Sequence, residues 1–398
     1  MGRLRFLTAG ESHGPALTAI LEGMPAGLPL SPDDLRADLA RRQGGYGRGG
    51  RMLIEKDAAE LLGGVMGGKT TGAPISLLIR NRDWKSWRDR DIAPLTVPRP
   101  GHADLTGAIK YGYGDLRLAL ERASARETAA RVAVGAICKR LLGAFGITVK
   151  GYVVEIGGVV ATLEGMSYER RFEASEASDV RCPDPEASEA MRARIHQAKV
   201  DRDTLGGVFE VVALGLPPGL GSYVHWDRRL SGRLMGAVGS IHAIKGVEIG
   251  PAFENARLQG TQVHDPIVRD ADGTLRRASN RAGGLEGGIT TGEPLVVRAA
   301  MKPISTTLNP IPSVDLATGE ASPTQYERSD FCAVPAAAVV GEAMVAFVLA
   351  DALVEKLGGD SLAEMRPRFE ALRWGRLDEL KMDNAPWRFD IEADLGEA

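Results

Sequence analysis

The chain has 398 residues, a formal charge of −3 at neutral pH and 25% charged residues, which is the composition of an ordinary globular protein. This charge does not mark the surface as a binder of polyanions, and an aromatic content of 5% leaves few platforms for stacking nucleic-acid bases. Three scattered cysteines without metal-ligand spacing, and a start without an apolar signal segment, predict a cytoplasmic protein with no metal site and no membrane span.

Two helices are predicted in the first part of the chain. Ser31 is an N-cap residue followed by a proline at the first helical position, and leucines then recur at helical spacing. The second helix should span about residues 125–142, because Ser124 and Glu127 match a capping box and apolar residues recur every three or four positions. Each helix should therefore present one apolar face to a core.

Strands and helices also alternate in the rest of the chain. Segments rich in valine at 150–160, 208–216 and 295–301 are typical of strands, and leucines at 230–241 indicate a helix. A further helix is expected at 334–357. A proline and a glutamate interrupt its apolar run, so we expect a buried helix rather than a membrane span. Helices and antiparallel strands in separate layers, an α+β fold, fit this pattern.

A weak internal repeat indicates that the chain is duplicated. Three segments of the first half recur in the same order in the second, namely 23–28 at 215–220, 67–74 at 287–294 and 121–124 at 327–330. We therefore expect one domain of residues 1–398, with similar halves at roughly 1–145 and 205–358 that share a core and are related by a pseudo-twofold. Residues 173–189 are expected to be a surface insertion, and residues 360–398 a C-terminal extension.

Two histidines have surroundings typical of functional residues. His13 lies between glycines in the segment 10–15, and His102 follows a proline and a glycine in the segment 99–104. An imidazole with a pKa near about 6.5 can act as an acid or a base at neutral pH. For each histidine the alternative is a structural or merely exposed side chain.

Positive charge gathers on a glycine-rich loop at 41–51, directly after the first predicted helix. Guanidinium groups such as those of Arg42 and Arg48 bind phosphate and carboxylate groups through paired donors. The alternatives are a solvated basic loop and an RNA-binding segment of the arginine–glycine kind. The run is short and follows a well-capped helix, which argues against RNA binding.

Further anion-binding groups occur in both halves. Ser124 and Arg126 open a predicted helix, whose N-terminus offers N–H groups and a partial positive charge. Lys302 follows a predicted strand and precedes several hydroxyl side chains, while Asp330, beside Arg328, is either a counter-ion or a working base. The sequence has no P-loop, dinucleotide fingerprint, nucleophile elbow or zinc motif. These residues indicate an enzyme that handles a small, multiply anionic substrate.

The same stretches resemble the chorismate synthase family. The matching segments span nearly the whole chain, namely 10–15, 41–51, 99–104, 121–134, 245–250, 283–292, 302–306 and 328–335. The resemblance implies a β–α–β sandwich, with central helices between two antiparallel sheets, assembled as a homotetramer. It also implies a lyase that eliminates phosphate from 5-enolpyruvylshikimate 3-phosphate in an anti-1,4 sense, giving chorismate on the shikimate pathway to aromatic amino acids.

The resemblance also implies roles for individual residues. His13 would protonate the departing phosphate, His102 would protonate the reduced flavin, and Asp330 would help to remove the ring proton. The substrate's phosphate and carboxylates would be held by Ser12, Arg42, Arg48, Ser124, Arg126 and Arg328. The flavin would contact Arg122, Ala123, Ser124, His242, Ala243, Gly287, Lys302, Pro303, Ile304, Ser305, Thr306 and Arg328.

The cofactor implied by the resemblance is reduced FMN, which is required although the reaction has no net redox change. The family is also connected with NADP, but here an external flavin reductase is expected to reduce the flavin. Ala123 stands where many relatives have serine, and His242 where asparagine is common. The alternatives are a flavin- or phosphate-binding protein without this chemistry and an RNA-binding module.

Overall fold

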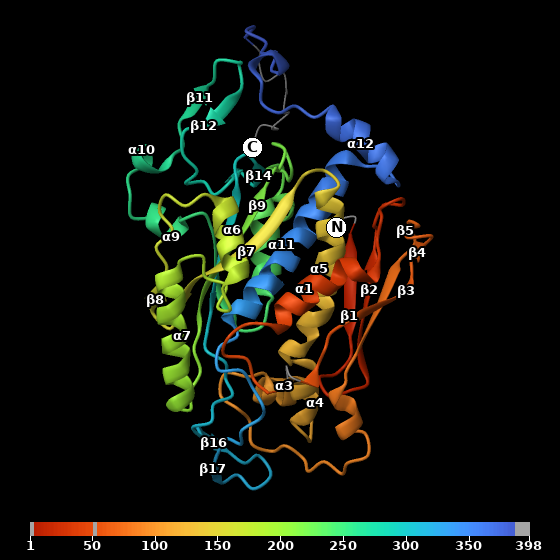
Figure 1. Cartoon of the computed structure of the whole chain (residues 1–398), viewed down its shortest axis with the longest axis vertical. Coiled ribbons are helices and arrows are strands. Elements are labelled where there is room, and N and C mark those ends of the chain that lie inside the picture. Colours follow the sequence, from red (N-terminus) through yellow and green to blue (C-terminus); the bar gives the residue numbers. More distant parts are fainter. Residues whose placement is uncertain (1–3, 51–53, 387–398) are drawn as a thin grey trace, which may run out of the picture.

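The structure is a computed structural model that describes residues 4–50 and 54–386. Two larger sheets, both antiparallel, form its framework (Figure 1). The first has the order β1 (Arg5–Ala9), β2 (Ala16–Glu22), β6 (Ile75–Arg80), β3 (Ala59–Gly63). The second has the order β10 (Ile244–Ile249), β15 (Leu295–Met301), β9 (Gly207–Leu214), β7 (Thr148–Ile156), β8 (Val159–Val160). The expected α+β fold with antiparallel sheets is confirmed.

The core helices pack against both sheets. They are α1 (Pro32–Gln43), α5 (Thr128–Gly143), α8 (Leu230–Gly239) and α11 (Val334–Leu357). Helix α5 contacts β2 and β6 of the first sheet, α11 contacts β7 and β9 of the second, and the two helices pack on each other (Figure 1). A Cβ atom at Gly135 would lie 2.3 Å from that of Ala343, so glycine is what allows the two helices to approach this closely.

Helix α11 is the centre of the core. Within the described parts of the chain it is the one helix long and apolar enough to cross a membrane, yet nearly all of its apolar stretch is buried inside the protein. Its alanines and valines therefore pack against neighbouring helices and strands rather than lipid. Glu342, which interrupts the apolar run, is itself fully buried.

The remaining elements are shorter and surround this framework. The strands are β4 (Val65–Met66), β5 (Lys69–Thr70), β11 (Ile267–Arg269), β12 (Leu275–Arg277), β13 (Leu285–Glu286), β14 (Ile289–Thr290), β16 (Pro312–Val314) and β17 (Ala321–Pro323). The helices are α3 (Asp104–Tyr111), α4 (Arg117–Arg122), α6 (Tyr168–Ala177), α7 (Pro185–Val200), α9 (Ala252–Asn255), α10 (Gly260–Val263) and α12 (Leu362–Glu370). Short 3-10 turns are η1 (Asp83–Ser86), η2 (Ala125–Glu127), η3 (Trp226–Arg228) and η4 (Leu377–Glu379). Part of the expected C-terminal extension, 387–398, lies outside the described residues.

The helix expected from residue 125 begins differently from the prediction. Ser124 accepts a hydrogen bond from the backbone N–H of Arg126 and opens η2, and α5 follows only at Thr128. The Glu127 carboxylate instead accepts hydrogen bonds from Thr8 Oγ1 at 2.6 Å and from Arg131 Nε at 2.9 Å. Thr8, 119 positions away, and Arg131, one helical turn later, therefore use the carboxylate that the sequence assigned to a capping box.

The segment 173–189, expected to be a surface insertion, is partly helical and partly buried. It covers the end of α6 and the start of α7, and Ser175 and Ala187 are buried. Glu176 forms an ion pair with Arg41 of α1. The segment therefore fastens α6 and α7 to the core.

The hairpins β4–β5 and β13–β14, which the internal repeat relates, make equivalent hydrogen bonds. Thr70 Oγ1 donates to the Pro25 carbonyl at 2.6 Å and accepts from the Leu28 N–H at 2.9 Å. The hydroxyl of Thr290 does the same, with the Pro217 carbonyl at 2.7 Å and the Leu220 N–H at 2.8 Å. The turns before β6 and β15 also match, because the N–H groups of residues 71 and 291 each donate at 3.0 Å to a glycine carbonyl seven positions earlier.

Candidate active site

A cavity of about 440 Å³ lies beside the first turns of α11 and brings together most of the predicted site residues. Those that line it are Ser12, His13, Arg42, Arg48, His102, Ala123, Ser124, Arg126, His242, Ala243, Lys302, Ile304, Ser305, Thr306, Arg328 and Asp330. They come from loops and element ends of both halves of the chain. The volume is in the range of cavities that bind small molecules.

Three predicted site residues do not line this cavity. Pro303 lies between two lining residues, and Arg122 lines a separate surface hollow, where its guanidinium donates to Thr8. Gly287 lies in the turn between β13 and β14, next to Tyr223. Figure 1 shows β14 at the opposite end of the molecule from α3 and α4, which flank the cavity.

His13 is held by a carboxylate from a distant part of the chain. Its Nδ1 lies 2.8 Å from Oε1 of Glu121, and its backbone N–H donates to Oε2 of the same residue at 2.7 Å. Burial raises the pKa of Glu121, but the hydrogen bonds from His13 outweigh it and keep this pKa below its ordinary value. The imidazole also packs on the Trp87 ring, with 4.2 Å between ring centroids. Its orientation is therefore defined on two sides.

His102 has an equally defined partner. Its Nδ1 lies 2.5 Å from Oδ1 of the fully buried Asp104, which Arg99 also clamps with hydrogen bonds of 2.8 and 3.0 Å. Burial raises the pKa of Asp104, but His102 and Arg99 more than reverse this and hold it well below its usual range. Arg99 also donates to Thr306 Oγ1 at 3.0 Å, which ties the histidine to the other half of the chain.

Arg42 and Arg126 form a buried pair of cations at one wall of the cavity. They share the Asp57 carboxylate, whose oxygens lie 3.2 Å from Arg42 Nη1 and 2.6 Å from Arg126 Nη1. Burial lowers the pKa of Arg42 to about 10; Asp57 opposes this, while Arg126 and Arg48 add to it. A bound anion would therefore stabilise the charged forms of these buried arginines.

Arg48 and Asp330 join the glycine-rich loop to the second half. Arg48 Nη1 lies 2.6 Å from Oδ2 of Asp330, and the backbone N–H of Gly49 donates to Oδ1 at 2.6 Å. Arg328 is half-exposed and donates to the buried Asp83 at 2.8 Å. Asp330 is thus a counter-ion in this structure, at the edge of a cavity where it could also accept a proton. Arg51, the last residue of the predicted basic loop, lies outside the described residues.

Ser12 and Ser124 meet between the histidine and arginine sides of the cavity. The Ser124 hydroxyl donates to that of Ser12 at 3.1 Å and accepts from the N–H of Arg126 at 3.3 Å. The backbone N–H of Ser12 donates to the Glu121 carbonyl at 3.1 Å. Two hydroxyls and a cation thus face one small volume, an arrangement suited to phosphate oxygens.

The segment 302–306 follows the end of β15, as predicted. The backbone N–H of Lys302 donates to the Ala243 carbonyl at 2.9 Å, and its ammonium donates to the Gly101 carbonyl at 2.9 Å. Burial lowers the pKa of Lys302, and Lys245 adds to this effect. Ala243 adopts a left-handed conformation, with φ of 64°, so the turn that presents it to the cavity is under backbone strain.

His242 lies between the cavity and the hollow that contains Arg122, and lines both. Its Nδ1 is buried and has no hydrogen-bond partner among the described residues. Burial lowers the pKa of His242 to about 4; Glu127 opposes this shift, and Arg131, His102 and Arg122 reinforce it. The side chain is therefore a neutral imidazole at physiological pH, with a ring nitrogen that a ligand could satisfy.

Several residues that define the site were not singled out by sequence reasoning. Glu121 and Asp104 were quoted only as parts of motifs, and Trp87 and Asp57 were not named. Asp104 could have been found, because a carboxylate two residues after a histidine can reach its ring. For Glu121 and Asp57 no local signal exists, because their partners are distant in sequence. Across the described ranges, no group of three or more His, Cys, Asp or Glu side chains could hold a metal ion.

Known proteins resemble this chain over most of its length. Residues 4–354 match the family model described as chorismate synthase. A chorismate synthase of Syntrophotalea carbinolica is 57% identical over 381 residues, covering 93% of this chain and 98% of the relative. One of Aquifex aeolicus is 57% identical over 384 residues, covering 92% and 96%. A crystal structure of chorismate synthase superposes with a TM-score of 0.76 at 50% identity, covering 92% of this chain and 96% of that one.

Proposed function

The chain belongs to the chorismate synthase family, and from this premise we propose that it eliminates phosphate from 5-enolpyruvylshikimate 3-phosphate with reduced FMN as its cofactor. The observation that carries the proposal is that two histidines held by carboxylates, Asp330 and five arginines line one cavity of about 440 Å³. Such a cavity combines charge neutralisation with groups that can move protons.

The arginine side of the cavity suits the substrate's negative charges. Arg42, Arg48, Arg126 and Arg328 would bind the phosphate and carboxylates through paired N–H donors, with Ser12 and Ser124 adding hydroxyl groups. Burial disfavours the charged form of Arg42, because water cannot solvate its guanidinium. A bound anion would therefore stabilise this charge. This arrangement also neutralises charge as the carbon–oxygen bond breaks.

Two protonation roles follow from the histidines. His13, oriented by Glu121, would give a proton from Nε2 to the departing phosphate. His102, oriented by Asp104, would hold a proton toward the flavin and stabilise negative charge on it. Asp330 would take part in removing the ring proton once bound ligands displace water from its carboxylate.

The residues present fit a flavin. Apolar side chains that line the cavity, those of Ile241, Met301, Ala337 and Val340, suit a flat ring system. Lys302 and the hydroxyls of Ser305 and Thr306 suit its phosphate, and the unsatisfied Nδ1 of His242 suits a polar ring atom. When bound, reduced FMN would supply electron density as phosphate leaves.

We further infer that the chain is an internally duplicated β–α–β sandwich. The matching hydrogen bonds of Thr70 and Thr290 support two related halves, at roughly 1–145 and 205–358. A cytoplasmic homotetramer served by an external flavin reductase is part of the same proposal.

The decisive experiment is anaerobic turnover with chemically reduced FMN, followed by the absorbance of the diene product and by phosphate release. Turnover is expected only with reduced flavin, and His13→Ala should lose most of it while still binding FMN. His196→Ala, an exposed histidine on α7, is the matched control and should keep full turnover. Equal product formation with no flavin present would overturn the proposal.

A further inference from the structure

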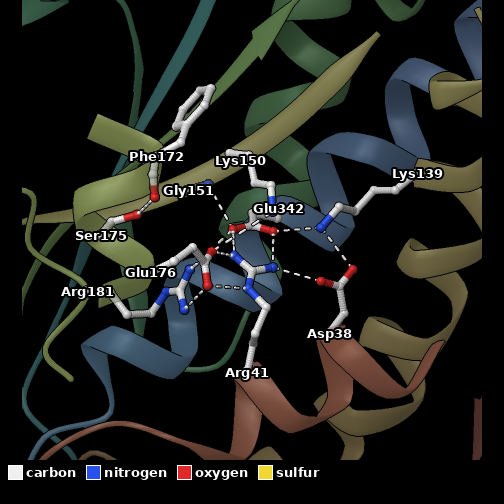
Figure 2. Close-up of polar contacts among 10 residues, drawn as sticks. All are labelled: Asp38, Arg41, Lys139, Lys150, Gly151, Phe172, Ser175, Glu176, Arg181 and Glu342. Atoms are coloured by element: carbon white, nitrogen blue, oxygen red, sulfur yellow. Dashed lines mark hydrogen bonds and ion pairs between the residues drawn. The ribbon is translucent and has the colours of Figure 1, made fainter. Parts of the chain in front are cut away.

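A fully buried carboxylate lies in the middle of the apolar helix α11. Glu342 is surrounded by charged side chains from α1, α5 and the chain around α6, as Figure 2 shows. Burial raises the pKa of Glu342, but Lys139, Arg41 and Arg181 more than reverse the shift and hold it well below its usual range. The glutamate is therefore ionised, and the helix tolerates it only because cations surround it.

Arg41 makes the most complete contact with this carboxylate. Its Nη1 and Nη2 lie 2.7 and 2.6 Å from the two oxygens of Glu342, a paired geometry that restricts rotation of the guanidinium. Lys139 of α5 donates to the same carboxylate at 2.8 Å, and so does the backbone N–H of Gly151 in β7. Glu342 therefore joins α1, α5 and the second sheet at one point.

A second layer of ion pairs extends this cluster to the segment between α6 and α7. Glu176 Oε1 lies 2.5 Å from Arg41 Nη2 and 2.6 Å from Arg181 Nη2. Asp38 completes the set by binding both Arg41 and Lys139. The cluster thus contains three carboxylates, those of Asp38, Glu176 and Glu342, and the cations Arg41, Lys139, Arg181 and Lys150, the last 4.0 Å from Glu176.

The cluster holds the glycine-rich loop of the cavity at two points. Arg41 occupies the last turn of α1 and directly precedes Arg42, whose guanidinium lines the cavity. Further along the loop, the N–H of Tyr46 donates to the Asp179 carbonyl at 2.7 Å, in the segment that Arg181 and Glu176 fasten. From there the loop continues to Arg48, which pairs with Asp330.

We propose that Glu342 is a positioning residue for the substrate's anionic groups, acting through Arg41 to fix the end of α1 and the loop that carries Arg42 and Arg48. The inference rests on the proposed function, because it assigns these two arginines to the substrate. The carboxylate itself does not line the cavity, so its effect is transmitted by the backbone of the helix and loop. The residues proposed for the flavin phosphate, Lys302, Ser305 and Thr306, are not members of this cluster.

The test is Glu342→Gln, which keeps the shape of the side chain but turns an amide toward Arg41 and Lys139. Displacement of the loop should raise KM for the phosphorylated substrate about tenfold or more, since small misplacements of binding groups carry costs of this order. The Kd of oxidised FMN, measured by fluorescence, should stay within about twofold, because Lys302, Ser305 and Thr306 of its phosphate subsite lie outside the cluster. An unchanged KM in Glu342→Gln, with wild type active, would overturn the inference.

Asp351→Asn is the matched control on the same helix. Asp351 is also a buried carboxylate that pairs with an arginine, Arg233, and accepts a backbone N–H, from Leu4 at 2.8 Å, but it lies away from the cavity. Its variant should lose stability without raising KM for the substrate. If Asp351→Asn raised KM as much as Glu342→Gln does, the rise would come from a general destabilisation of α11. That result would contradict the positioning role of Glu342.

Hydrogen exchange provides a readout independent of catalysis. Backbone amides of residues 44–50 should exchange faster in Glu342→Gln than in wild type, and those of β15 should not.

If Glu342→Gln does not fold, Glu176→Gln serves instead, because Glu176 is one-third exposed and still binds Arg41 through both oxygens. It should give smaller changes of the same kind, and unchanged exchange in the folded variant would count against the proposal. An inactive wild type would refute the proposed function alone.

Discussion

Glu121 binds His13 through both of its carboxylate oxygens, one to the ring Nδ1 at 2.8 Å and one to the backbone N–H at 2.7 Å. A carboxylate only accepts hydrogen bonds, so Nδ1 carries the proton and exchange with a ligand would use Nε2. The same carboxylate fixes where the histidine lies and which nitrogen can act. The pair joins the turn between β1 and β2 to helix α4, more than 100 positions later in the sequence.

Replacing Glu121 with glutamine should therefore lower kcat while FMN binding persists. The amide can no longer hold Nδ1–H as a charged acceptor, so we expect a loss of roughly tenfold to a hundredfold, within the range of general acid catalysis. Steady-state kinetics with reduced FMN would measure it. Glu60→Gln, which breaks the exposed pair with Arg80, should leave kcat unchanged. A Glu121→Gln enzyme with wild-type kcat would contradict this role.

Gly49→Ala should disrupt the contact between the basic loop and the second half. A Cβ atom at this position would lie 2.4 Å from the Ser329 carbonyl oxygen, so the segment carrying Asp330 must move. We expect kcat/KM to fall about tenfold or more, because Arg48 and Asp330 would separate. Gly50→Ala is the matched control: a Cβ there meets nothing within 4 Å, and kcat/KM should be retained. Equal effects of the two variants would rule out this explanation.

His242 should make the stability of the protein depend on pH. Burial lowers its pKa to about 4 in the folded chain, whereas an unfolded histidine titrates near about 6.5. Between these values the unfolded state binds more protons, so the free energy of unfolding falls as the pH is lowered, by about 1–3 kcal/mol from this group. Below pH of about 4 the contribution levels off.

The free energy of unfolding, measured in urea at neutral pH and at about pH 5, would test this effect. His242→Asn cannot be protonated and should lose less stability over this interval than wild type, by the same 1–3 kcal/mol or so. His196→Asn, on an exposed surface, should follow wild type. If the free energy of unfolding fell equally with pH in His242→Asn and in wild type, the assignment of a neutral, buried imidazole to His242 would be wrong.

The matching hydrogen bonds of the two hairpins predict matching losses of stability. Thr70→Val and Thr290→Val each remove a buried hydroxyl that satisfies one carbonyl and one N–H group. Each should cost about 1–3 kcal/mol in chemical denaturation, because the backbone groups are left without partners. Thr71→Val, at an exposed neighbouring position, should cost less than about 0.5 kcal/mol. A large cost in only one of the two hairpins would contradict their equivalence.

Local sequence patterns identified the elements well, because their causes are local. Ser31 and the following proline mark the start of α1, and β15 spans the valine-rich segment expected at 295–301. The failures involve residues whose partners are distant. Glu127 matches a capping box, yet it binds Thr8 and Arg131 instead. Composition likewise gave no sign that Glu176, in the expected surface insertion at 173–189, forms an ion pair with Arg41.

The candidate site was predicted as a set of residue types, not as a geometry. His13, His102 and Asp330 were named from their motifs and resemblance, and all three line one cavity. Their partners could not be derived in the same way. Gly49 and Asp330, for example, are 281 positions apart and meet at 2.6 Å. Glu342 was noted only as an interruption of an apolar helix.

The amino-acid sequence alone predicted the core helices α1, α5, α8 and α11 and the strands β7, β9 and β15, named the candidate charged and acid–base residues, and indicated to which family the motifs belong. Helix caps, apolar spacing and short motifs act over a few residues, so they can be recognised without a fold. The tertiary structure alone decided that Glu121 holds His13, that Asp57 is shared by two arginines, and that Glu342 is buried among cations. Hydrogen bonds and ion pairs depend on distances of a few ångströms, and only the packing of the whole chain sets those distances.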